Sequence, residues 1–279
     1  MTLRGVTAIF ISALCLSSCN WPEGNPDASG PLADGVLDAG YIPYPPSLIV
    51  DPNSGEFSGI SYDVLEEIAD RLGVELDPDE ELAWGTMIEN LNAGRSEIVA
   101  TGIWPTPERD AQADFSNPIF YSPVYAYVRA DDNRFDGNLQ VANQPNITIS
   151  ILDGEVAESI AREDFAQASE LSLPQISQVS ELLLNVQNGK ADVTFVEPAI
   201  AQEFLDANPG SIKRVEGIEP VRAFPTTFMV PDGEQEFLAE LNRVLAEMQQ
   251  DGTVNRIIDR YEEHDGSFIR VSDFAPTSN

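Results

Sequence analysis

The chain has 279 residues, of which 42% are hydrophobic, so it is long and apolar enough for one or two folded domains and is neither disordered nor fibrous. It contains 47 acidic and 15 basic residues, which gives a formal net charge of −32. Such a surface repels nucleic acid and anionic lipid headgroups, and no nucleic-acid partner is expected. A solvated acidic coat suited to a saline medium explains the charge; a basic partner or a cationic ligand is the alternative.

The N-terminus has the pattern of an export signal. Arg4 precedes the apolar run VTAIFISALCL, which is too short to span a membrane but fits the hydrophobic part of a secretory signal. The run ends in LSSC, which resembles the lipobox of bacterial lipoproteins, whose cysteine becomes a lipidated first residue. By this resemblance, residues 1–19 are a lipoprotein signal peptide and Cys19 is the membrane anchor. An ordinary signal peptide with an incidental cysteine is the alternative.

Two expectations about the mature chain follow from this interpretation. Cys15 lies within the removed signal, so the mature chain would hold no disulfide and no cysteine-based metal site. Residues 20–35 are rich in Pro, Gly, Asn and Asp and show no periodicity. They are expected to form a flexible tether that holds the folded part away from the membrane.

Strands and helices are then predicted to alternate. The first series is a strand GVLDAGYI, a turn at DPNSGEFSG, an amphipathic helix SYDVLEEIADRLG closed by Gly73, a helix TMIENLNAGR, a buried strand SEIVATGI and a strand YSPVYAYVRA. The second series is NITISIL (strand), GEVAESIAREDF (helix), LPQISQV (strand), SELLLNVQNGK (helix), ADVTFVE (strand), AFPTTFMV (strand) and EQEFLAELNRVLAEMQQDG (helix). This alternation predicts largely parallel sheets.

One unit of the pattern occurs twice. Residues 90–104 (NLNAGRSEIVATGIW) return in altered form as residues 185–199 (NVQNGKADVTFVEPA). Each copy predicts a helix, a tight turn at a glycine and a buried strand, and two such copies indicate two similar α/β lobes rather than a solenoid. We expect the chain to cross from one lobe to the other near residue 130 and to return near 222, and two crossings make a hinge.

Several segments resemble the family 3 extracellular solute-binding proteins, the amino-acid-type receptors of ABC importers. They are YPP at 44–46, GISYDVLEEIADRLG, WGTMIENLNAGR, GIWPTPERDAQADFSNPIFYS, LLLNVQNGKADVTFVEP and LAEMQQDGTVNRIIDRY. The resemblance implies the α/β type II periplasmic-binding-protein fold, with two α/β lobes joined by a two-strand hinge. The lobes would comprise residues 36–129 with 224–264 (lobe 1) and residues 130–223 (lobe 2), and residues 265–279 would be a C-terminal tail.

The resemblance also implies a ligand site between the lobes. The arginine of the TPER block, Arg109, would bind a ligand carboxylate through its guanidinium fork. Glu197 would take the ligand ammonium. Tyr44 and Trp84 would be aromatic walls, and the loop entered at Thr101 and Gly102 would line the cleft. For each side chain an ordinary surface role is the alternative; Arg109, for instance, would then pair only with its acidic neighbours.

Three positions depart from the family pattern. Trp104 stands where a hydroxyl is usual, Tyr41 where an acid is usual, and Glu155 within the anion-binding turn of the second lobe. These changes remove hydroxyl donors for a carboxylate and add two aromatic rings and an acid. A zwitterion with a bulky or cationic end fits the full set of residues.

The sequence therefore predicts a binding lipoprotein in the cell envelope, on the periplasmic or extracytoplasmic side. It would be a monomer without cofactor or metal, and it would deliver a small amino-acid-like or zwitterionic amine solute to an ABC permease. One alternative is an enzyme similar to cyclohexadienyl dehydratases, with Glu197 or Glu155 as general acid. Another is a binding lipoprotein that senses its ligand without transporting it. His264, the only histidine, lies in a polar segment where a solvated role is expected.

Overall fold

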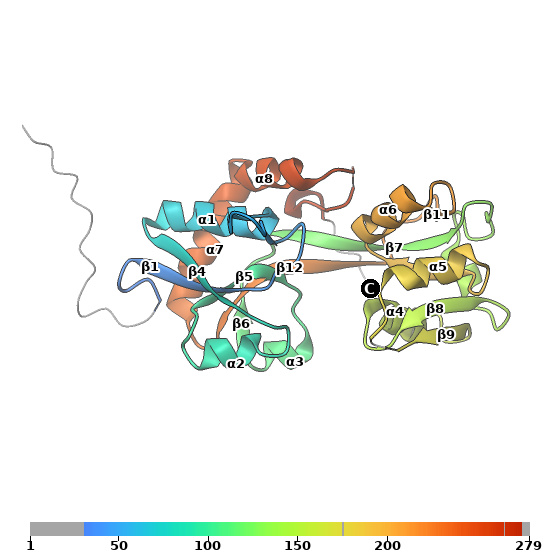
Figure 1. The fold of residues 1–279 in the computed structure, drawn as a ribbon, viewed down its shortest axis with the longest axis horizontal. Coiled ribbons are helices and arrows are strands. Elements are labelled where there is room, and N and C mark those ends of the chain that lie inside the picture. Colours follow the sequence, from blue (N-terminus) through green and yellow to red (C-terminus); the bar gives the residue numbers. More distant parts are fainter. Residues whose placement is uncertain (1–30, 175, 265, 275–279) are drawn as a thin grey trace, which may run out of the picture.

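A computed structural model describes residues 31–174, 176–264 and 266–274. It has two lobes side by side, joined by two long strands (Figure 1). The predicted signal peptide, Cys19 and most of the tether lie outside the described residues. Within the described ranges, none of the helices combines the length and the apolar character needed to cross a bilayer.

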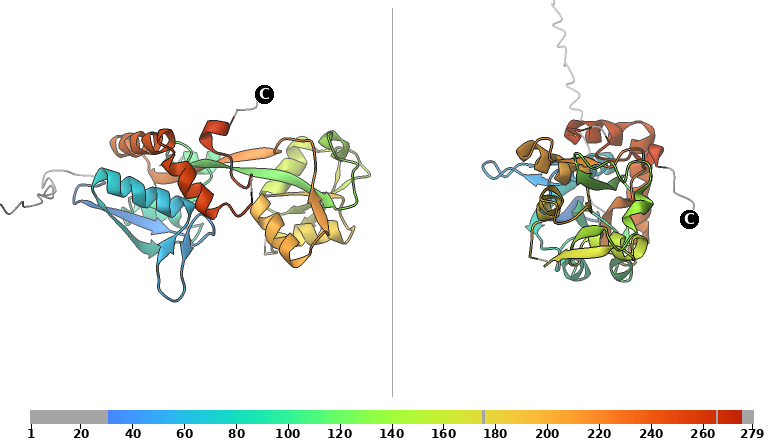
Figure 2. Two further views of the ribbon diagram at one scale, coloured as in Figure 1. Left: turned by 90° about the horizontal axis from the view of Figure 1, so that it is seen from above. Right: turned by 90° about the vertical axis from the view of Figure 1, so that its right-hand side faces the viewer.

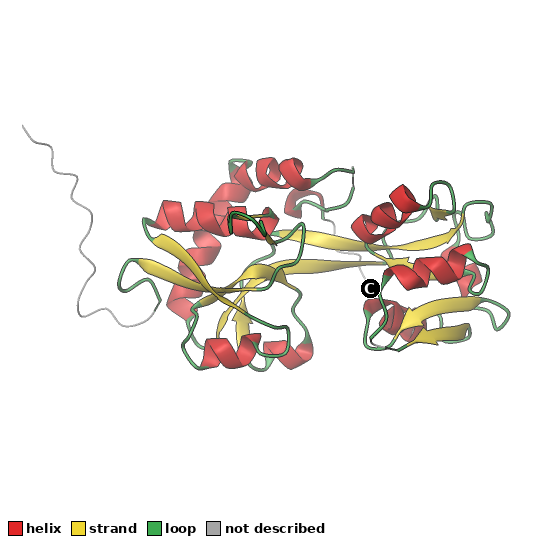
Figure 3. Ribbon diagram, viewed as in Figure 1, coloured by secondary structure: helices red, strands yellow, loops and turns green. Residues whose placement is uncertain are grey.

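Lobe 1 is a sheet covered by helices on both faces (Figure 3). The strand order is β4-β1-β5-β12-β6, where β12 is Arg222–Pro231; β1, β4 and β5 are parallel and β12 is antiparallel to its neighbours. Two hydrophobic clusters fill the two faces, one under α1, α7 and α8 and the other under α2. The strands are β1 (Val36–Tyr41), β4 (Glu75–Glu81), β5 (Ile98–Ile103), β6 (Ala113–Phe115) and the hairpin β2 (Ile49–Val50) with β3 (Phe57–Ser58); the helices are α1 (Ile60–Leu72), α2 (Met87–Asn92), α3 (Pro107–Asp110), α7 (Gln235–Gln250) and α8 (Thr253–Tyr261).

Lobe 2 repeats this plan around a single hydrophobic cluster. Its strand order is β9-β8-β10-β7-β11, with β8, β9 and β10 parallel and β7 antiparallel to β10 and β11. The remaining elements are β8 (Thr148–Leu152), β9 (Ser169–Leu173), β10 (Val193–Val196), β11 (Ile212–Arg214), the helices α4 (Val156–Asp164), α5 (Ser180–Gln187) and α6 (Pro198–Ala207), and a short 3₁₀ helix at Leu139–Ala142. A second 3₁₀ helix, Val271–Asp273, lies in the C-terminal segment.

The repeated sequence unit forms the same structure in both lobes. Gly94 and Gly189 end α2 and α5 with φ angles of 65° and 67°, values that favour glycine. The residue after each glycine donates its amide to the carbonyl of the equivalent asparagine, Asn90 at 3.2 Å and Asn185 at 2.9 Å. β5 and β10 follow. The predicted helix, turn and strand are therefore present twice, and loops at the carboxyl ends of these strands meet between the lobes.

The hinge is the strand pair β7 (Phe120–Arg129) and β12 (Arg222–Pro231), each of which also completes the sheet of one lobe. Phe120 to Val124 pair antiparallel with Arg222 to Thr226. The expected first crossing near residue 130 differs from this arrangement, because residues 125–128 already pair with β10 and belong to the lobe 2 core. The hinge therefore begins several residues earlier, within one uninterrupted strand.

Three further segments differ from expectation. The predicted strand over 173–179 is wrong: β9 ends at Leu173, because Pro174 cannot continue the ladder of hydrogen bonds. The acidic β4 was not predicted. Its residues alternate between exposed and partly buried, and all its acids except Glu80 are on the exposed side. Residues 266–274 of the expected tail instead pack beside the hinge, as Figure 2 shows.

Candidate functional site

A cleft between the lobes is lined by both of them, by the hinge and by the C-terminal segment. Four of the expected site residues line it. Tyr44 comes from the turn after β1, Gly102 and Trp104 come from β5 and the loop that follows it, and Glu197 comes from the turn after β10 in lobe 2. The full set is Tyr44, Pro45, Pro46, Ser47, Gly102, Trp104, Phe120, Ser122, Glu197, Ala199, Ile200, Thr226, Ser267 and Phe268.

Tyr44 and Trp84 form an aromatic pair at the edge of lobe 1. Their rings meet edge to face, with centroids 5.6 Å apart at 89°. The residues are 43% and 44% exposed, whereas most large apolar side chains of the described chain are buried. Trp84 is in contact with Tyr44 but is not among the residues that line the cleft. Such an exposed pair is suited to covering a ligand.

Arg109 is positioned by α3 and by Trp104. Thr106 caps α3 by accepting a hydrogen bond from the amide of Arg109 at 3.3 Å. The guanidinium Nη1 donates to the carbonyl oxygen of Trp104 at 2.7 Å, and the Trp104 ring stacks on Phe224 of β12. Burial lowers the pKa of Arg109. No ion pair joins Arg109 to an acid within the described residues, so most of its donors remain available for an anion.

Glu197 and Glu155 stand at equivalent places in lobe 2. Glu155 precedes α4 at the end of β8, and Glu197 precedes α6 at the end of β10. Because β8 and β10 are parallel neighbours, both residues lie at the same edge of the sheet. Glu197 lines the cleft, whereas Glu155 is not among the lining residues. A negative charge at a helix N-terminus is favourable.

Glu197 meets Tyr44 across the cleft. Burial raises the pKa of Glu197 to about 7; a polar contact with Tyr44 opposes this rise, and the charge of Glu155 adds to it. The Glu197 carboxylate in turn raises the pKa of Tyr44, with burial and Glu155 as further causes. Partial burial also raises the pKa of Glu155, although this residue is largely exposed. A positive charge on a ligand bound here would favour the ionised forms of all three groups and so oppose the rise in their pKa values.

Gly102 allows close packing where β5 reaches the hinge. A Cβ atom at this position would lie 2.3 Å from Cγ2 of Thr226 and 2.7 Å from Oγ of Ser61. The Gly102 amide donates to Oγ of Ser47 at 3.1 Å. A larger residue would push β5 away from β12 and disturb the floor of the cleft.

Tyr41 and Thr101 are not brought into the cleft. The Tyr41 ring meets Phe57 edge to face at 4.8 Å and packs on the core of lobe 1. The Thr101 hydroxyl accepts from the amide of Ile42 and donates to its carbonyl, both at 2.8 Å, and the residue is fully buried. Both side chains therefore join elements of lobe 1.

Three hydroxyl residues of the cleft floor were missed by sequence reasoning. Ser122 and Thr226 lie on the two hinge strands, and their hydroxyls are 3.0 Å apart. Ser47 lies in the turn after Tyr44, with its hydroxyl 2.8 Å from that of Ser61. The two crossings inferred from the sequence were a usable signal for Ser122 and Thr226, because hinge strands must pass beneath the ligand.

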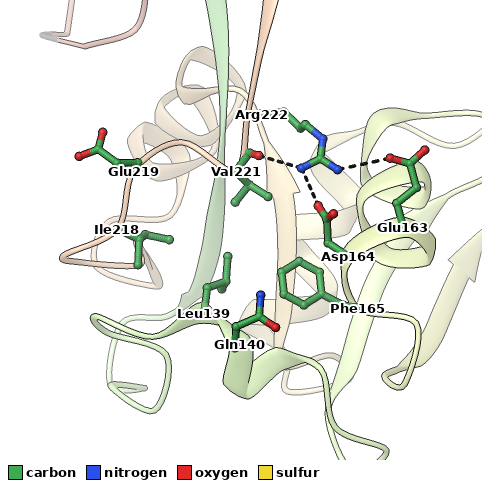
Figure 4. A pocket seen from close by; sticks show the side chains of 9 residues that line it. All are labelled: Leu139, Gln140, Glu163, Asp164, Phe165, Ile218, Glu219, Val221 and Arg222. Carbon is green, nitrogen blue, oxygen red and sulfur yellow. Dashed lines mark hydrogen bonds and ion pairs between the residues drawn. The ribbon is translucent and has the colours of Figure 1, made fainter. Parts of the chain in front are cut away.

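A second cavity lies within lobe 2 and contains none of the predicted site residues (Figure 4). Arg222 is its main charged group. Its Nη1 lies 2.6 Å from Asp164 and donates to the carbonyl of Val221 at 3.0 Å, while Nη2 lies 3.3 Å from Glu163. Glu163 and Asp164 already pair with Arg222, so this guanidinium is not free for a ligand. Because the cavity also contains none of the predicted site residues, the cleft between the lobes is the better candidate site.

Comparison with known proteins identifies the family to which the chain belongs. Residues 38–264 match the model of the bacterial extracellular solute-binding proteins, family 3. The chain belongs to this family. A family 3 relative, a probable amino-acid ABC transporter-binding protein of Haemophilus influenzae, is 24% identical over 207 residues, which is 73% of this chain and 76% of the relative.

Solved structures of similar proteins confirm the predicted type II periplasmic-binding fold. An ancestral cationic amino acid solute-binding protein has a TM-score of 0.64 and 26% identity, covering 81% of this family 3 chain and 95% of its own. An ancestral cyclohexadienyl dehydratase has a TM-score of 0.57 and 28% identity, covering 85% of this chain and 98% of its own. The same fold thus carries both binding proteins and an enzyme among these neighbours.

Proposed function

We propose that the protein captures an amino-acid-like ligand in the cleft and delivers it to an ABC importer. The observation that supports this proposal is the contact across the cleft between Tyr44 of lobe 1 and the carboxyl of Glu197 of lobe 2. Arg109 is not itself among the lining residues, but its guanidinium is held by the carbonyl of Trp104, which is. Relatives that bind amino acids for ABC transporters support it. In this role the ligand leaves the cleft chemically unchanged, and no enzymatic step is required.

The ligand we propose is a zwitterion with a cationic or bulky end. Arg109 would bind its carboxylate through donors that no described acid occupies. Glu197 would bind the ammonium group, and Glu155 would favour a second positive charge nearby. The rings of Tyr44 and Trp84 would cover the ligand and attract a cation through their faces.

Calorimetric titration tests the proposal. The panel is L-arginine, L-lysine, L-glutamine and glycine betaine, which differ in net charge and in the ability of the nitrogen to donate hydrogen bonds. We expect the cationic amino acids to bind most tightly and the betaine to bind weakly, because its nitrogen has no proton for Glu197. Absence of binding by every amino acid of the panel at millimolar concentration would reject the proposed ligand class.

An enzyme is the second candidate, and one observation favours it. With a pKa of about 7, Glu197 is protonated in a large fraction of molecules near neutral pH, as a general acid must be. In a dehydration it would give its proton to the leaving hydroxyl, which departs as water while the carbon–oxygen bond breaks. The carboxylate on the ring would leave as carbon dioxide, and the electrons of its carbon–carbon bond would complete the aromatic ring. A cyclohexadienyl acid, monitored by the ultraviolet absorption of an aromatic product, tests this; Glu197→Gln must abolish any activity found.

The setting of the protein is part of the proposal. We propose a monomer on the periplasmic or extracytoplasmic side of the cell envelope, held by a lipid on Cys19. A small-molecule solute and an ABC permease would be its partners, and a role in ligand sensing without transport is the alternative. Growth on the ligand as sole nitrogen source, with and without the gene, separates transport from sensing.

A further inference from the structure

The C-terminal strap, residues 266–274, is fastened to lobe 1. Glu262, whose side chain is 8% exposed, follows α8 and accepts hydrogen bonds from two strap amides at 3.1 Å each. Arg270 of the strap pairs with this carboxylate and, at 2.5 Å, with Asp259 of α8. A largely buried ion pair with Glu262, a more exposed one with Asp259 and two hydrogen bonds from backbone amides hold the strap on lobe 1.

The strap also runs beside the hinge strand β7 and joins it through an isolated β-bridge (Figure 2). Ile269 and Tyr121 of β7 exchange two backbone hydrogen bonds of 2.9 Å. Tyr121 is opposite Pro225 of β12, so the strap lies on the other edge of β7. The Tyr121 ring stacks on Phe274, with centroids 3.7 Å apart at 14°. The strap therefore contacts the free edge of β7 at the lobe 1 end of the hinge through both backbone and ring.

One side of the strap faces the cleft. Side chains alternate along β7, so Phe120 and Ser122 line the cleft while Tyr121 points to the opposite face. Phe268 packs edge to face on Phe120, with centroids 5.1 Å apart, and lines the cleft as well. Across the cleft is the first turn of α6 in lobe 2, which contributes Ile200.

We propose that the strap is a wall of the ligand cleft, and that Phe268 encloses the apolar part of the ligand against Ile200 when the lobes close. This inference rests on the proposed function for the nature of the ligand. The charged ends of a zwitterion are served by Arg109 and Glu197, but neither recognises an aliphatic stem. The facing pair of Phe268 and Ile200 supplies that apolar contact and selects for ligands with a hydrocarbon side chain.

Titration with L-arginine tests the role of Phe268 through a matched pair of variants. Phe268→Ala should weaken binding about 5- to 30-fold, the range for truncating an enclosed aromatic contact. Phe274→Ala removes a ring from the same strap on the face away from the cleft and should change the dissociation constant less than about two-fold. Equal effects of the two variants, or no effect of Phe268→Ala, would overturn the proposal.

Cross-linking tests the same geometry without a ligand. In a Cys15→Ser/Cys19→Ser background, Phe268→Cys with Ile200→Cys should be joined by a short bismaleimide, while Phe274→Cys with Ile200→Cys should not. If L-arginine fails to bind the unaltered protein, the proposed ligand class fails, and this experiment alone decides the role of the strap. Failure to join Cys pairs at 268 and 200, or equal joining of both pairs, would overturn the inference.

Discussion

Removing the charge of Glu197 should stabilise the protein, and more so as the pH rises. Burial raises the pKa of this carboxyl from its ordinary 4.5 to about 7, so the folded state holds the proton more tightly than the unfolded state does. Below pH 4.5 both states are protonated and there is no penalty. Above that pH the unfolded state ionises first, and the folded state loses stability until its own carboxyl ionises near pH 7.

The size of this effect follows from the two pKa values. Between pH 5 and pH 8 the penalty should grow by at most about 2.5 kcal/mol, and by less where water reaches the partly exposed carboxyl. Glu197→Gln removes the penalty. Its melting temperature relative to the wild type should therefore increase by up to roughly 5 to 10 °C over this pH range.

Thermal unfolding of both proteins at pH 5 and pH 8, without ligand, measures this difference. Glu203→Gln is the matched control, because Glu203 is an exposed acid on the same helix, α6. The difference in melting temperature between Glu203→Gln and the wild type should be the same at both pH values. An effect of Glu197→Gln that is independent of pH, or a loss of stability at pH 8, would refute the reasoning about this carboxyl.

Four other predictions follow from the same structure. Arg109→Ala should weaken binding of L-arginine at least about 30-fold in calorimetry, since a desolvated carboxylate loses its partner; a change under two-fold would remove Arg109 from the site. Gly102→Ala should cost about 1 to 3 kcal/mol in denaturant unfolding, because the new Cβ would overlap Thr226; an unchanged midpoint contradicts this. With a net charge of −32, the melting temperature should rise from low to molar salt, whereas a flat or falling curve argues against self-repulsion. Cys19→Ala should move the protein from the membrane to the soluble fraction, and an unchanged distribution rejects the lipid anchor.

The two-lobed architecture was predictable because local signals repeat. Gly94 and Gly189 end equivalent helices at equivalent distances from a buried strand, and the left-handed conformation of both glycines explains why the motif survives in each copy. Glu197 follows the second strand directly, so its place at the cleft came from the same pattern. Helix ends, turns and buried strands depend on patterns of a few neighbouring residues, and such patterns can be read directly from a sequence.

The direction of individual side chains was less predictable. Thr101 and Tyr41 stand near the ends of strands that lead to the cleft, but each is held by a tertiary partner, the backbone of Ile42 for one and the Phe57 ring for the other. The position of the strap beside the cleft was not predicted for a related reason. Phe268 gains its role from contact with Phe120, almost 150 positions earlier in the chain, and no local pattern marks such a contact.

The central claim is that the two lobes close on a ligand with charges at both ends. Small-angle X-ray scattering of the wild type, with and without saturating L-arginine, tests it most directly. We predict a smaller radius of gyration with L-arginine, and no such change for Glu197→Gln at the same L-arginine concentration. An unchanged radius for a wild type that calorimetry shows to be saturated would contradict closure around the ligand.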